Sequence, residues 1–172
     1  MKLRWLWRTF ADPARLRQEL VEGRSRRLRK RRVMIALAAL GAADTLLIAL
    51  RQAGVIRRLP EIPGRLFRSN DVVTSPAAFA LGVPDGPVGA AAFALIAALT
   101  SRLGAGPPRR RPVATLALLG VNGGVVLAGA HYLRQMLSVQ KKLCAYCLVA
   151  SGLGFTLLSL VASEVAALER EG

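Results

Sequence analysis

The sequence predicts an all-α integral membrane protein, a four-helix transmembrane bundle with a short surface helix in its first outer loop. Three observations predict this fold. Of the 172 residues, 53% are hydrophobic, and the mean hydropathy of +0.38 does not suit a soluble domain. The net charge of +15 is concentrated in the N-terminal segment and the loops. Four apolar stretches that can serve as membrane spans lie between these charged regions.

The same composition excludes several classes of protein. Intrinsic disorder is excluded for the bulk of the chain because the apolar fraction is too high. Two Cys residues, three positions apart, cannot staple a secreted fold. With a single His they also cannot supply the four ligands of a zinc ion, so no metal site is predicted.

Residues 1–32 form a basic segment that we expect on the cytoplasmic side of a membrane domain of residues 33–168. The segment holds twelve Lys or Arg residues, with aromatic residues interleaved near its start. This pattern predicts an interfacial segment on an anionic surface, so membrane lipid is an expected partner. Asp12 and Pro13 suit the N-cap and first position of a helix. Nucleic-acid binding is the rival interpretation, and we expect no nucleic-acid partner because the arm runs directly into an apolar span.

The first span is predicted over residues 33–50, which contain a single charged side chain, Asp44. A signal peptide has similar ingredients, but the basic region here is too long for one, so an uncleaved helix is predicted. An acid inside a span is unfavourable unless it is paired or faces a cavity. Asp44 therefore pairs with an Arg at the outer surface, such as Arg51, or lies beside a bound ligand.

A polar loop follows over residues 51–75, then a short apolar helix over 76–81 and a dense turn over 82–87. The remaining three spans are predicted over residues 87–101, 113–133 and 143–168. Small residues recur every fourth position in the third span, at Gly120, Gly124 and Ala128. Such a face predicts close approach of a neighbouring helix.

The distribution of basic residues predicts the orientation. With the N-terminus inside, the inner segments carry more Lys and Arg than the outer loops. The positive-inside rule then places both termini in the cytoplasm. We therefore expect a multi-pass protein of the cell inner (plasma) membrane, with the loops 51–75 and 134–142 on the outer face.

Cys144 and Cys147 begin the fourth predicted span, one helical turn apart, a spacing that suits a reversible disulfide. The helix N-terminus and the two preceding Lys residues favour the thiolate, so the pKa of Cys144 should be the lower of the two. On an oxidising outer face the pair is a redox device rather than a metal clip. A c-type haem attachment would need a His where Leu148 stands. The alternative is two small buried residues of a membrane helix.

At these residues the sequence resembles the vitamin K epoxide reductase family. Residues 142–151, KLCAYCLVAS, look like the family's redox motif entering its last helix. Residues 72–84, VVTSPAAFALGVP, look like its short loop helix, with a Ser-Pro start and a Gly-x-Pro turn. The resemblance covers about residues 33–165 and implies a four-helix transmembrane bundle around a quinone.

The resemblance implies a thiol-to-quinone oxidoreductase. Its electron acceptor would be a membrane quinone, menaquinone or ubiquinone, and its donor a periplasmic or extracellular thioredoxin-like thiol protein. Cys147 would pass electrons to the quinone, and Cys144 would exchange disulfides with the incoming thiol. Ser75 matches the family's serine beside the quinone, where a hydroxyl stabilises the negative charge that reduction builds. The residues expected around the quinone are Ser75, Cys147, Asp44, Phe79, Tyr146 and Ser151.

The first outer loop departs from the family pattern. The family usually carries a second cysteine pair there, which shuttles electrons from a soluble partner. Counting back from Ser75, the second shuttle cysteine should fall at Ser69, and residues 51–75 contain no Cys. Either a partner thiol attacks Cys144 directly, or the chain is a non-catalytic membrane subunit or quinone-binding component of a larger complex. A small transporter ranks last, because inverted repeats and intramembrane charge pairs are missing.

Three further polar residues fall within or near the spans. His131 is expected as an interfacial side chain beside Tyr132, with proton handling as the alternative. Asn122 is expected to donate an interhelical hydrogen bond. Glu164, near the inner end of the last span, is expected to extend to the headgroups.

Overall fold

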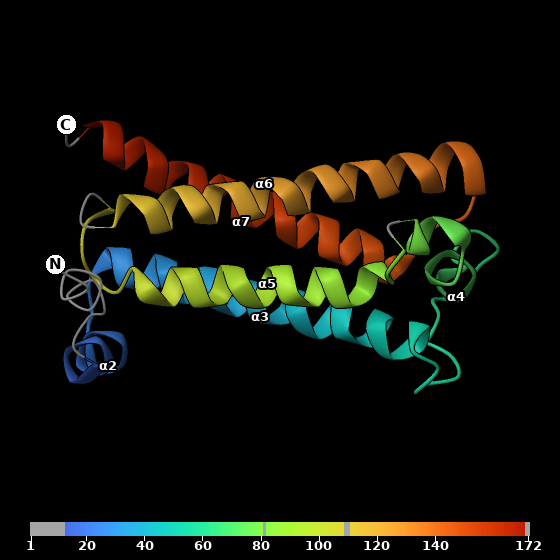
Figure 1. Ribbon diagram of the computed structural model, residues 1–172, viewed down its shortest axis with the longest axis horizontal. Coiled ribbons are helices and arrows are strands. Elements are labelled where there is room, and N and C mark those ends of the chain that lie inside the picture. The colour runs from blue at the N-terminus through green and yellow to red at the C-terminus, as the bar shows by residue number, and fades with distance from the viewer. Residues whose placement is uncertain (1–12, 81, 109–110, 171–172) are drawn as a thin grey trace, which may run out of the picture.

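The computed structural model describes residues 13–80, 82–108 and 111–170, and their regular structure is helical (Figure 1). In this part of the chain the only β-type pairing is an isolated bridge between Phe67 and Leu143. The elements in chain order are α2 (Pro13–Glu22), α3 (Arg26–Gln52), α4 (Ser69–Val73), the 3-10 helix η1 (Pro76–Phe79), α5 (Asp85–Arg102), α6 (Pro112–Gln135), the π-helical turn η3 (Met136–Gln140) and α7 (Ala145–Arg170).

Four long helices, α3, α5, α6 and α7, lie side by side and alternate in direction (Figure 1). Helix α3 packs against α5 and α7, and α6 packs against the same two helices. We call the two ends of this bundle the α2 end and the α4 end, after the short helix found at each. The end of α3 and the start of α7 meet at the α4 end, and α4 lies beside them.

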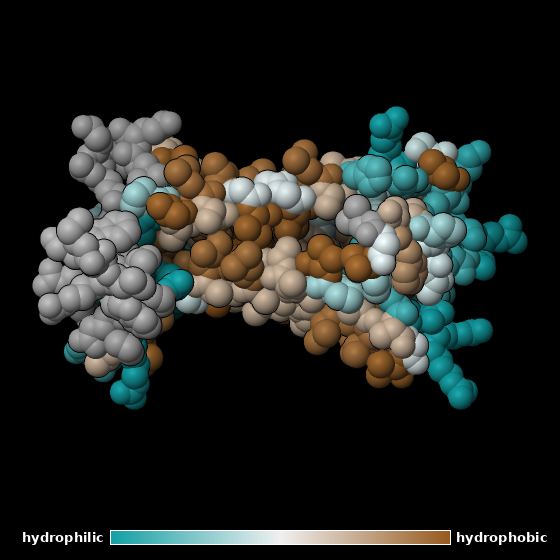
Figure 2. Space-filling model, in the orientation of Figure 1, coloured by the Kyte–Doolittle hydropathy of each residue, from teal (hydrophilic) through white to brown (hydrophobic). Residues whose placement is uncertain are grey.

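Three of the long helices have the length and composition to cross a membrane, namely Arg26–Gln52, Pro112–Gln140 and Ala145–Ala166. Helix α5 is shorter and carries Asp85 and Arg102 at its two ends. Apolar side chains cover the middle of the visible surface, whereas hydrophilic ones gather at the α4 end (Figure 2). An outward apolar surface of this kind is typical of helices that face lipid. The prediction of spanning helices is thus confirmed for three of the four.

The helix boundaries differ from the predicted ones in physically simple ways. Helix α2 begins at Pro13, as predicted, while Asp12 and the aromatic residues before it lie outside the described residues. Helix α3 begins at Arg26, so part of the predicted basic segment is continuous with the first span. Ser25 caps it, because its Oγ accepts the Leu28 N–H at 3.2 Å. The short helix α4 falls in the predicted loop, and the short apolar helix is η1.

The α2 end holds the larger hydrophobic core. Its buried members are Met34, Ala38, Phe93, Ile96, Leu103, Leu118, Leu157 and Val161, contributed by all four long helices. A Cβ at Gly41 would overlap the Phe93 ring, so this glycine allows α3 and α5 to approach closely. The close approach of α3 and α5 and the buried side chains make this end of the bundle tightly packed.

A buried ion pair fastens the same end. Arg31 is 1% exposed, and its Nη2 lies 2.6 Å from Oε2 of Glu164, which is itself 4% exposed. The Arg31 Nη1 donates to three carbonyl oxygens of the turn after α5, those of Leu103, Gly104 and Gly106. The prediction that Glu164 extends to the headgroups was wrong, because a charge this far from solvent is stable only when paired and hydrogen-bonded.

Gly120 and Gly124 of α6 do not provide the close helix approach that the sequence predicts. A Cβ at Gly120 or Gly124 would meet no atom within 4 Å, so no helix approaches closely there. Helix α6 instead approaches α7 closely at Gly129, where a Cβ would crowd Ser151, and at Val125, which lies against Gly154. Asn122 donates its Nδ2 to the Gly154 carbonyl of α7 at 3.4 Å, which confirms the predicted interhelical hydrogen bond.

Candidate functional site

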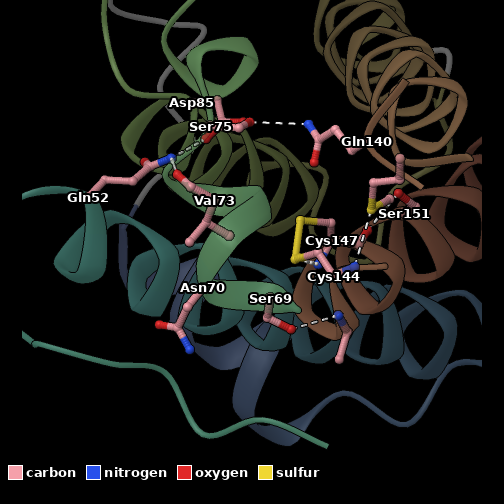
Figure 3. The surroundings of a disulfide bond; sticks show 12 residues. Gln52, Ser69, Asn70, Val73, Ser75, Asp85, Gln140, Cys144, Cys147 and Ser151 are labelled. Atoms are coloured by element: carbon pink, nitrogen blue, oxygen red, sulfur yellow. Dashed lines mark hydrogen bonds between the residues drawn. A yellow bond between two sulfur atoms is a disulfide. The ribbon is translucent and has the colours of Figure 1, made fainter. Parts of the chain in front are cut away.

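The two cysteines form a disulfide at the start of α7, with their Cα atoms 5.2 Å apart (Figure 3). Cys144 occupies the cap position: its carbonyl accepts the Leu148 N–H and its Sγ accepts the Cys147 N–H, each at 3.1 Å. The free N–H groups of a helix start favour negative charge. Such a setting would stabilise a thiolate at Cys144 once the disulfide is reduced.

The surroundings of the two sulfurs differ. Cys144 is 0% exposed and belongs to a small core at the α4 end, together with Ile48, Val72 and Met136. Cys147 is half-buried and lines a cavity that Cys144 does not line. Of the two cysteines, only Cys147 therefore borders the cavity, whereas Cys144 is enclosed by its core neighbours.

The cavity has a volume of about 310 Å³ and lies between the two hydrophobic cores. All four long helices and residues 72–78 contribute to its wall. Most of the lining is apolar, and its polar or titratable members are Thr45, Ser75, Asp85, Tyr132, Gln140, Cys147 and Ser151. A mostly apolar pocket with a few polar groups is the usual form of a small-molecule site, and this one is at the small end of the typical range.

Two glutamines hold the loop wall of the cavity in place (Figure 3). Gln140 of η3 donates its Nε2 to the Ser75 Oγ at 3.1 Å. Gln52, at the end of α3, donates its Nε2 to the Val73 carbonyl at 2.9 Å and to Oδ1 of Asp85 at 2.6 Å. Its Oε1 accepts the Gly86 N–H at 3.0 Å. These bonds fix the segment before η1 against α3, α5 and η3.

The structure brings some of the predicted site residues together. Ser75, Cys147 and Ser151 line the cavity, and Ser151 donates its Oγ to the Cys147 carbonyl at 2.7 Å. Phe79 is 39% exposed and Tyr146 donates its hydroxyl to the Pro60 carbonyl at 3.0 Å, and neither is among the lining residues.

Asp44 also lies away from the cavity lining. Its Oδ2 is buried and has no hydrogen-bond partner among the residues that the structure describes. Arg51, the predicted pairing partner, donates its Nε to Oδ1 of Asn70 at 3.1 Å instead. A buried carboxyl oxygen without a partner is unfavourable.

A segment of residues 66–73, which we call the cover, lies over Cys144. The Leu143 N–H donates to the Leu66 carbonyl at 2.8 Å, and the Arg68 N–H donates to the Leu143 carbonyl at 2.9 Å. Ser69 is 0% exposed, and its Oγ accepts the N–H of Ala145 at 3.1 Å. Ser69 thus contacts the residue that follows Cys144. It occupies the chain position at which the family pattern has its second shuttle cysteine.

Two carboxylates are tied into this outer loop. Lys142 donates its Nζ to Oδ2 of Asp71 at 2.8 Å, and this bond holds the pKa of Asp71 below its usual range. The Asn70 backbone N–H donates to Glu61 at 2.8 Å and lowers the pKa of that carboxyl in the same way. Both groups are exposed, so these contacts position the loop without contributing much stability.

Sequence reasoning missed four polar residues of the site: Gln52, Asp85, Tyr132 and Gln140. Each lies near the end of a predicted span, a place where polar residues are ordinary. In the sequence, Tyr132 stands out only as the neighbour of His131. The exposed His131 ring packs edge-on against the Tyr132 ring, with 5.8 Å between the centroids. Only the rotation of each helix within the bundle shows that these side chains face one another.

Comparison with known proteins identifies the family of the chain. The sequence model described as the vitamin K epoxide reductase family matches residues 32–162. The matched range takes in the cavity, the disulfide and the cover. No curated protein matches the chain at a significant level.

Proposed function

This chain belongs to the vitamin K epoxide reductase family, and on that premise we propose that it is a membrane thiol:quinone oxidoreductase. Electrons would enter the Cys144–Cys147 pair from an outer-face thiol protein and leave to a quinone in the cavity. The observation that carries the proposal is the division of the pair: Cys147 lines an apolar cavity, and Cys144 lies outside it under the loop.

The cavity fits the head of a quinone. A flat apolar ring matches the wall formed by residues such as Ile48, Phe93 and Val125. The carbonyl oxygens of such a ring need hydrogen-bond donors, and the hydroxyls of Ser75 and Tyr132 are present in the wall, whereas the Ser151 hydroxyl already donates to the Cys147 carbonyl. A bound quinone would supply the acceptor of two electrons and two protons. Asp44, Phe79 and Tyr146 are left out of this site because they do not line the cavity.

The proposed reaction transfers two electrons and two protons from the dithiol to the quinone. An incoming dithiol reduces the Cys144–Cys147 disulfide by exchange, through a mixed disulfide at Cys144. Cys147, freed as a thiol beside the cavity, passes two electrons onward as it closes the disulfide with Cys144 again. One dithiol and one quinone become one disulfide and one quinol.

Access to Cys144 requires movement of the cover. The sulfur is fully buried beneath residues 66–73, which backbone hydrogen bonds and the Lys142–Asp71 pair hold down. With Ser69 in place of a shuttle thiol, the donor protein must reach Cys144 after these bonds open. The donor would be a thioredoxin-like protein on the outer face. This requires the α4 end to face outward and both termini to be cytoplasmic in a four-span topology.

The test compares two single substitutions in lipid nanodiscs that contain menaquinone or ubiquinone. Cys144→Ser and Cys147→Ser should each abolish dithiol-dependent quinone reduction, followed by quinone absorbance. Only Cys147→Ser should trap a mixed disulfide with a thiol protein, because it retains the donor-facing sulfur. Unchanged turnover in both variants would overturn the proposal.

A second candidate function is that of a non-catalytic quinone-binding subunit. The buried, hydrogen-bonded Ser69 favours it, because no relay thiol stands between the solvent and Cys144. This candidate predicts that the isolated protein binds quinone but does not oxidise dithiols, and that it co-purifies with stoichiometric partners.

A further inference from the structure

A second hollow lies at the α4 end, in the outer loop rather than between the long helices. This groove has a volume of about 520 Å³, and its wall is made by Arg51 at the end of α3 and by residues between 58 and 74. It shares no lining residue with the cavity beside Cys147. A molecule bound in the groove would contact the segment that lies over Cys144. The lining residues that belong to this cover are Phe67, Arg68, Asn70 and Asp71.

The two carboxylates of the groove are already engaged within the loop. Asp71 Oδ2 accepts the Lys142 Nζ at 2.8 Å and lies 3.2 Å from the Arg68 Nε. Glu61 Oε1 accepts the backbone N–H of Asn70 at 2.8 Å. The acids of the groove are thus held by their own neighbours, and they leave little negative charge for its other arginines.

Positive charge in the groove remains without a counter-charge. Arg58 is exposed and makes no hydrogen bond or ion pair with any residue that the structure describes. Arg51 donates its Nε to Oδ1 of Asn70 at 3.1 Å, an amide that does not offset the charge. The surrounding loops 51–75 and 134–142 carry eight Lys or Arg residues and two acids. Guanidinium groups bind carboxylates in a bidentate manner, so the groove suits an acidic ligand.

Topology does not account for these basic residues. The positive-inside rule places Lys and Arg on the cytoplasmic side, whereas the α4 end faces outward in the orientation proposed above. Basic residues in short outer loops therefore work against that orientation. A surface that recognises an acidic partner is consistent with their distribution.

The cover also has a short free backbone edge beside the groove. Phe67 pairs with Leu143 in a parallel β-bridge, whose two hydrogen bonds involve the Leu66 carbonyl and the Arg68 N–H. In this pattern the N–H and carbonyl of Phe67 itself point away from Leu143. Neither group has a partner among the described residues, and Phe67 lines the groove. An unpaired edge of this kind matches an extended peptide better than a lipid headgroup or a phosphate ion.

We propose that the groove is the docking site of the thiol donor and that it binds an acidic, extended segment of that protein. The inference rests on the proposed function, because it names the surface at which the electron donor of that reaction is recognised. Arg51 and Arg58 bind carboxylates of the segment, and Phe67 pairs with its backbone. The donor's thiols are then held beside the cover, and their raised local concentration favours attack on Cys144 whenever the cover opens.

The test uses synthetic dithiol peptides as electron donors. Each joins a Cys-x-x-Cys segment through a flexible linker to a tail of glutamates, of glutamines, or of the same number of glutamates alternating with prolines. The protein is held in nanodiscs of uncharged lipid with menaquinone, and quinone absorbance gives kcat/KM for each peptide. We expect the glutamate tail to be preferred over the glutamine tail about tenfold at low salt and not at high salt. The alternating tail lacks N–H groups and should lose about threefold.

Arg58 and its neighbour Arg57 provide a matched pair of variants. Both residues are exposed, but only Arg58 lines the groove. Arg58→Gln should remove most of the preference for the glutamate tail, whereas Arg57→Gln, with the same loss of charge, should keep it. Arg58→Glu should favour a lysine tail instead, a reversal that misfolding cannot produce. With dithiothreitol, which has no tail, Arg58→Gln and Arg57→Gln should be equally active.

Docking is also measured apart from turnover. A fluorescent, cysteine-free glutamate peptide reports binding by anisotropy, and Arg58→Gln should weaken this binding about tenfold while Arg57→Gln retains it. Native mass spectrometry with added phosphatidylglycerol examines the other occupant. If Arg58→Gln loses a bound lipid that Arg57→Gln keeps, and both bind the peptide alike, the groove is a lipid site and the proposal is wrong.

The outcomes separate the docking site from the proposed function. A parent protein that oxidises all of the dithiols at equal rates keeps the proposed function and overturns the docking site. A parent protein that binds the glutamate peptide through Arg58 but oxidises no dithiol overturns the proposed function, and the groove then remains a site for acidic peptides.

Discussion

The two ends of the bundle are built from the same four helices but differ in how they are filled. At the α2 end, Gly41 lets α3 approach α5, and the Arg31–Glu164 pair joins α3 to α7 under full burial. Toward the α4 end, Gly124 of α6 has open space beside it, and a cavity of about 310 Å³ remains beside Cys147. A closed end can hold the helices in register, which leaves the other end free to stay hollow for a ligand.

The largest expected effect follows from removing the buried ion pair at the closed α2 end. Arg31→Met leaves the nearly fully buried Glu164 with Lys30 as its remaining partner. We expect a loss of about 3 kcal/mol in the free energy of unfolding, because the buried Oε2 of Glu164 loses its partner and only the partly exposed Lys30 still offsets the charge. Chemical unfolding in detergent measures it.

The neighbouring Arg32 provides the control for this substitution. Its Nη2 donates to carbonyl oxygens at the end of α2, those of Leu20 and Gly23, and the residue is partly exposed. Arg32→Met should therefore cost only about 1 kcal/mol. Equal losses in the two variants would mean that the Arg31–Glu164 pair does not fasten the bundle.

Filling the hollow end should have a large effect on ligand binding and little on folding. Gly124 lines the cavity, and a Cβ added there would meet no atom within 4 Å, so Gly124→Leu places a larger side chain at the open cavity wall. We expect quinone affinity to fall about tenfold or more, since one or two interactions of the ring are lost. The stability should rise by up to about 1 kcal/mol, because leucine favours the helix.

Gly120, one helical turn earlier, sharpens that test. It is equally open but does not line the cavity, so Gly120→Leu should gain the same helix stability and keep quinone affinity. A similar fall in affinity in both variants would show that the cavity is not the quinone site.

A moderate effect is expected where the cover meets the disulfide. Ser69→Ala removes the acceptor of the Ala145 N–H at the buried start of α7. The loss should be about 1 kcal/mol in stability. The disulfide should also be reduced faster by a bulky phosphine, measured by thiol labelling. Ser159→Ala, an exposed hydroxyl on the same helix, serves as the control and should change neither value.

The smallest effect concerns the exposed pair that holds the cover. The Lys142 contact keeps the pKa of folded Asp71 below 3.8, its ordinary value. Its stabilisation is therefore present above that pH and is lost as the pH falls through the folded pKa. Asp71→Asn at neutral pH should speed phosphine reduction of the disulfide by only about twofold, because exposed ion pairs contribute little.

A double-mutant cycle completes that measurement. Lys142→Met should have a slightly smaller effect than Asp71→Asn, which also loses the Arg68 contact, and the double variant should add nothing to Asp71→Asn. Additive effects would show that the two residues act separately. Acidification should then leave the parent and Asp71→Asn equally easy to reduce, whereas at neutral pH they differ.

The local features of this protein can be predicted from its sequence. Apolar runs and their ends predict the long helices, Pro13 starts α2, and the cysteine spacing predicts a disulfide at the start of the last span. The two motifs indicate the family, and counting back from Ser75 puts the position of the missing shuttle cysteine at Ser69. These predictions depend on residues close together in the chain, where periodicity and capping act.

The contacts between side chains of different helices become known only from the tertiary structure. Whether Gly124 packs against a helix or lines a cavity depends on how far apart α6 and its neighbours stand, which no single helix specifies. The contact of Gln52 with Asp85 and the burial of Arg31 against Glu164 join residues far apart in the chain. Such pairs are set by the rotation of each helix about its axis, which the packing of the whole bundle fixes and the pattern of one segment leaves open.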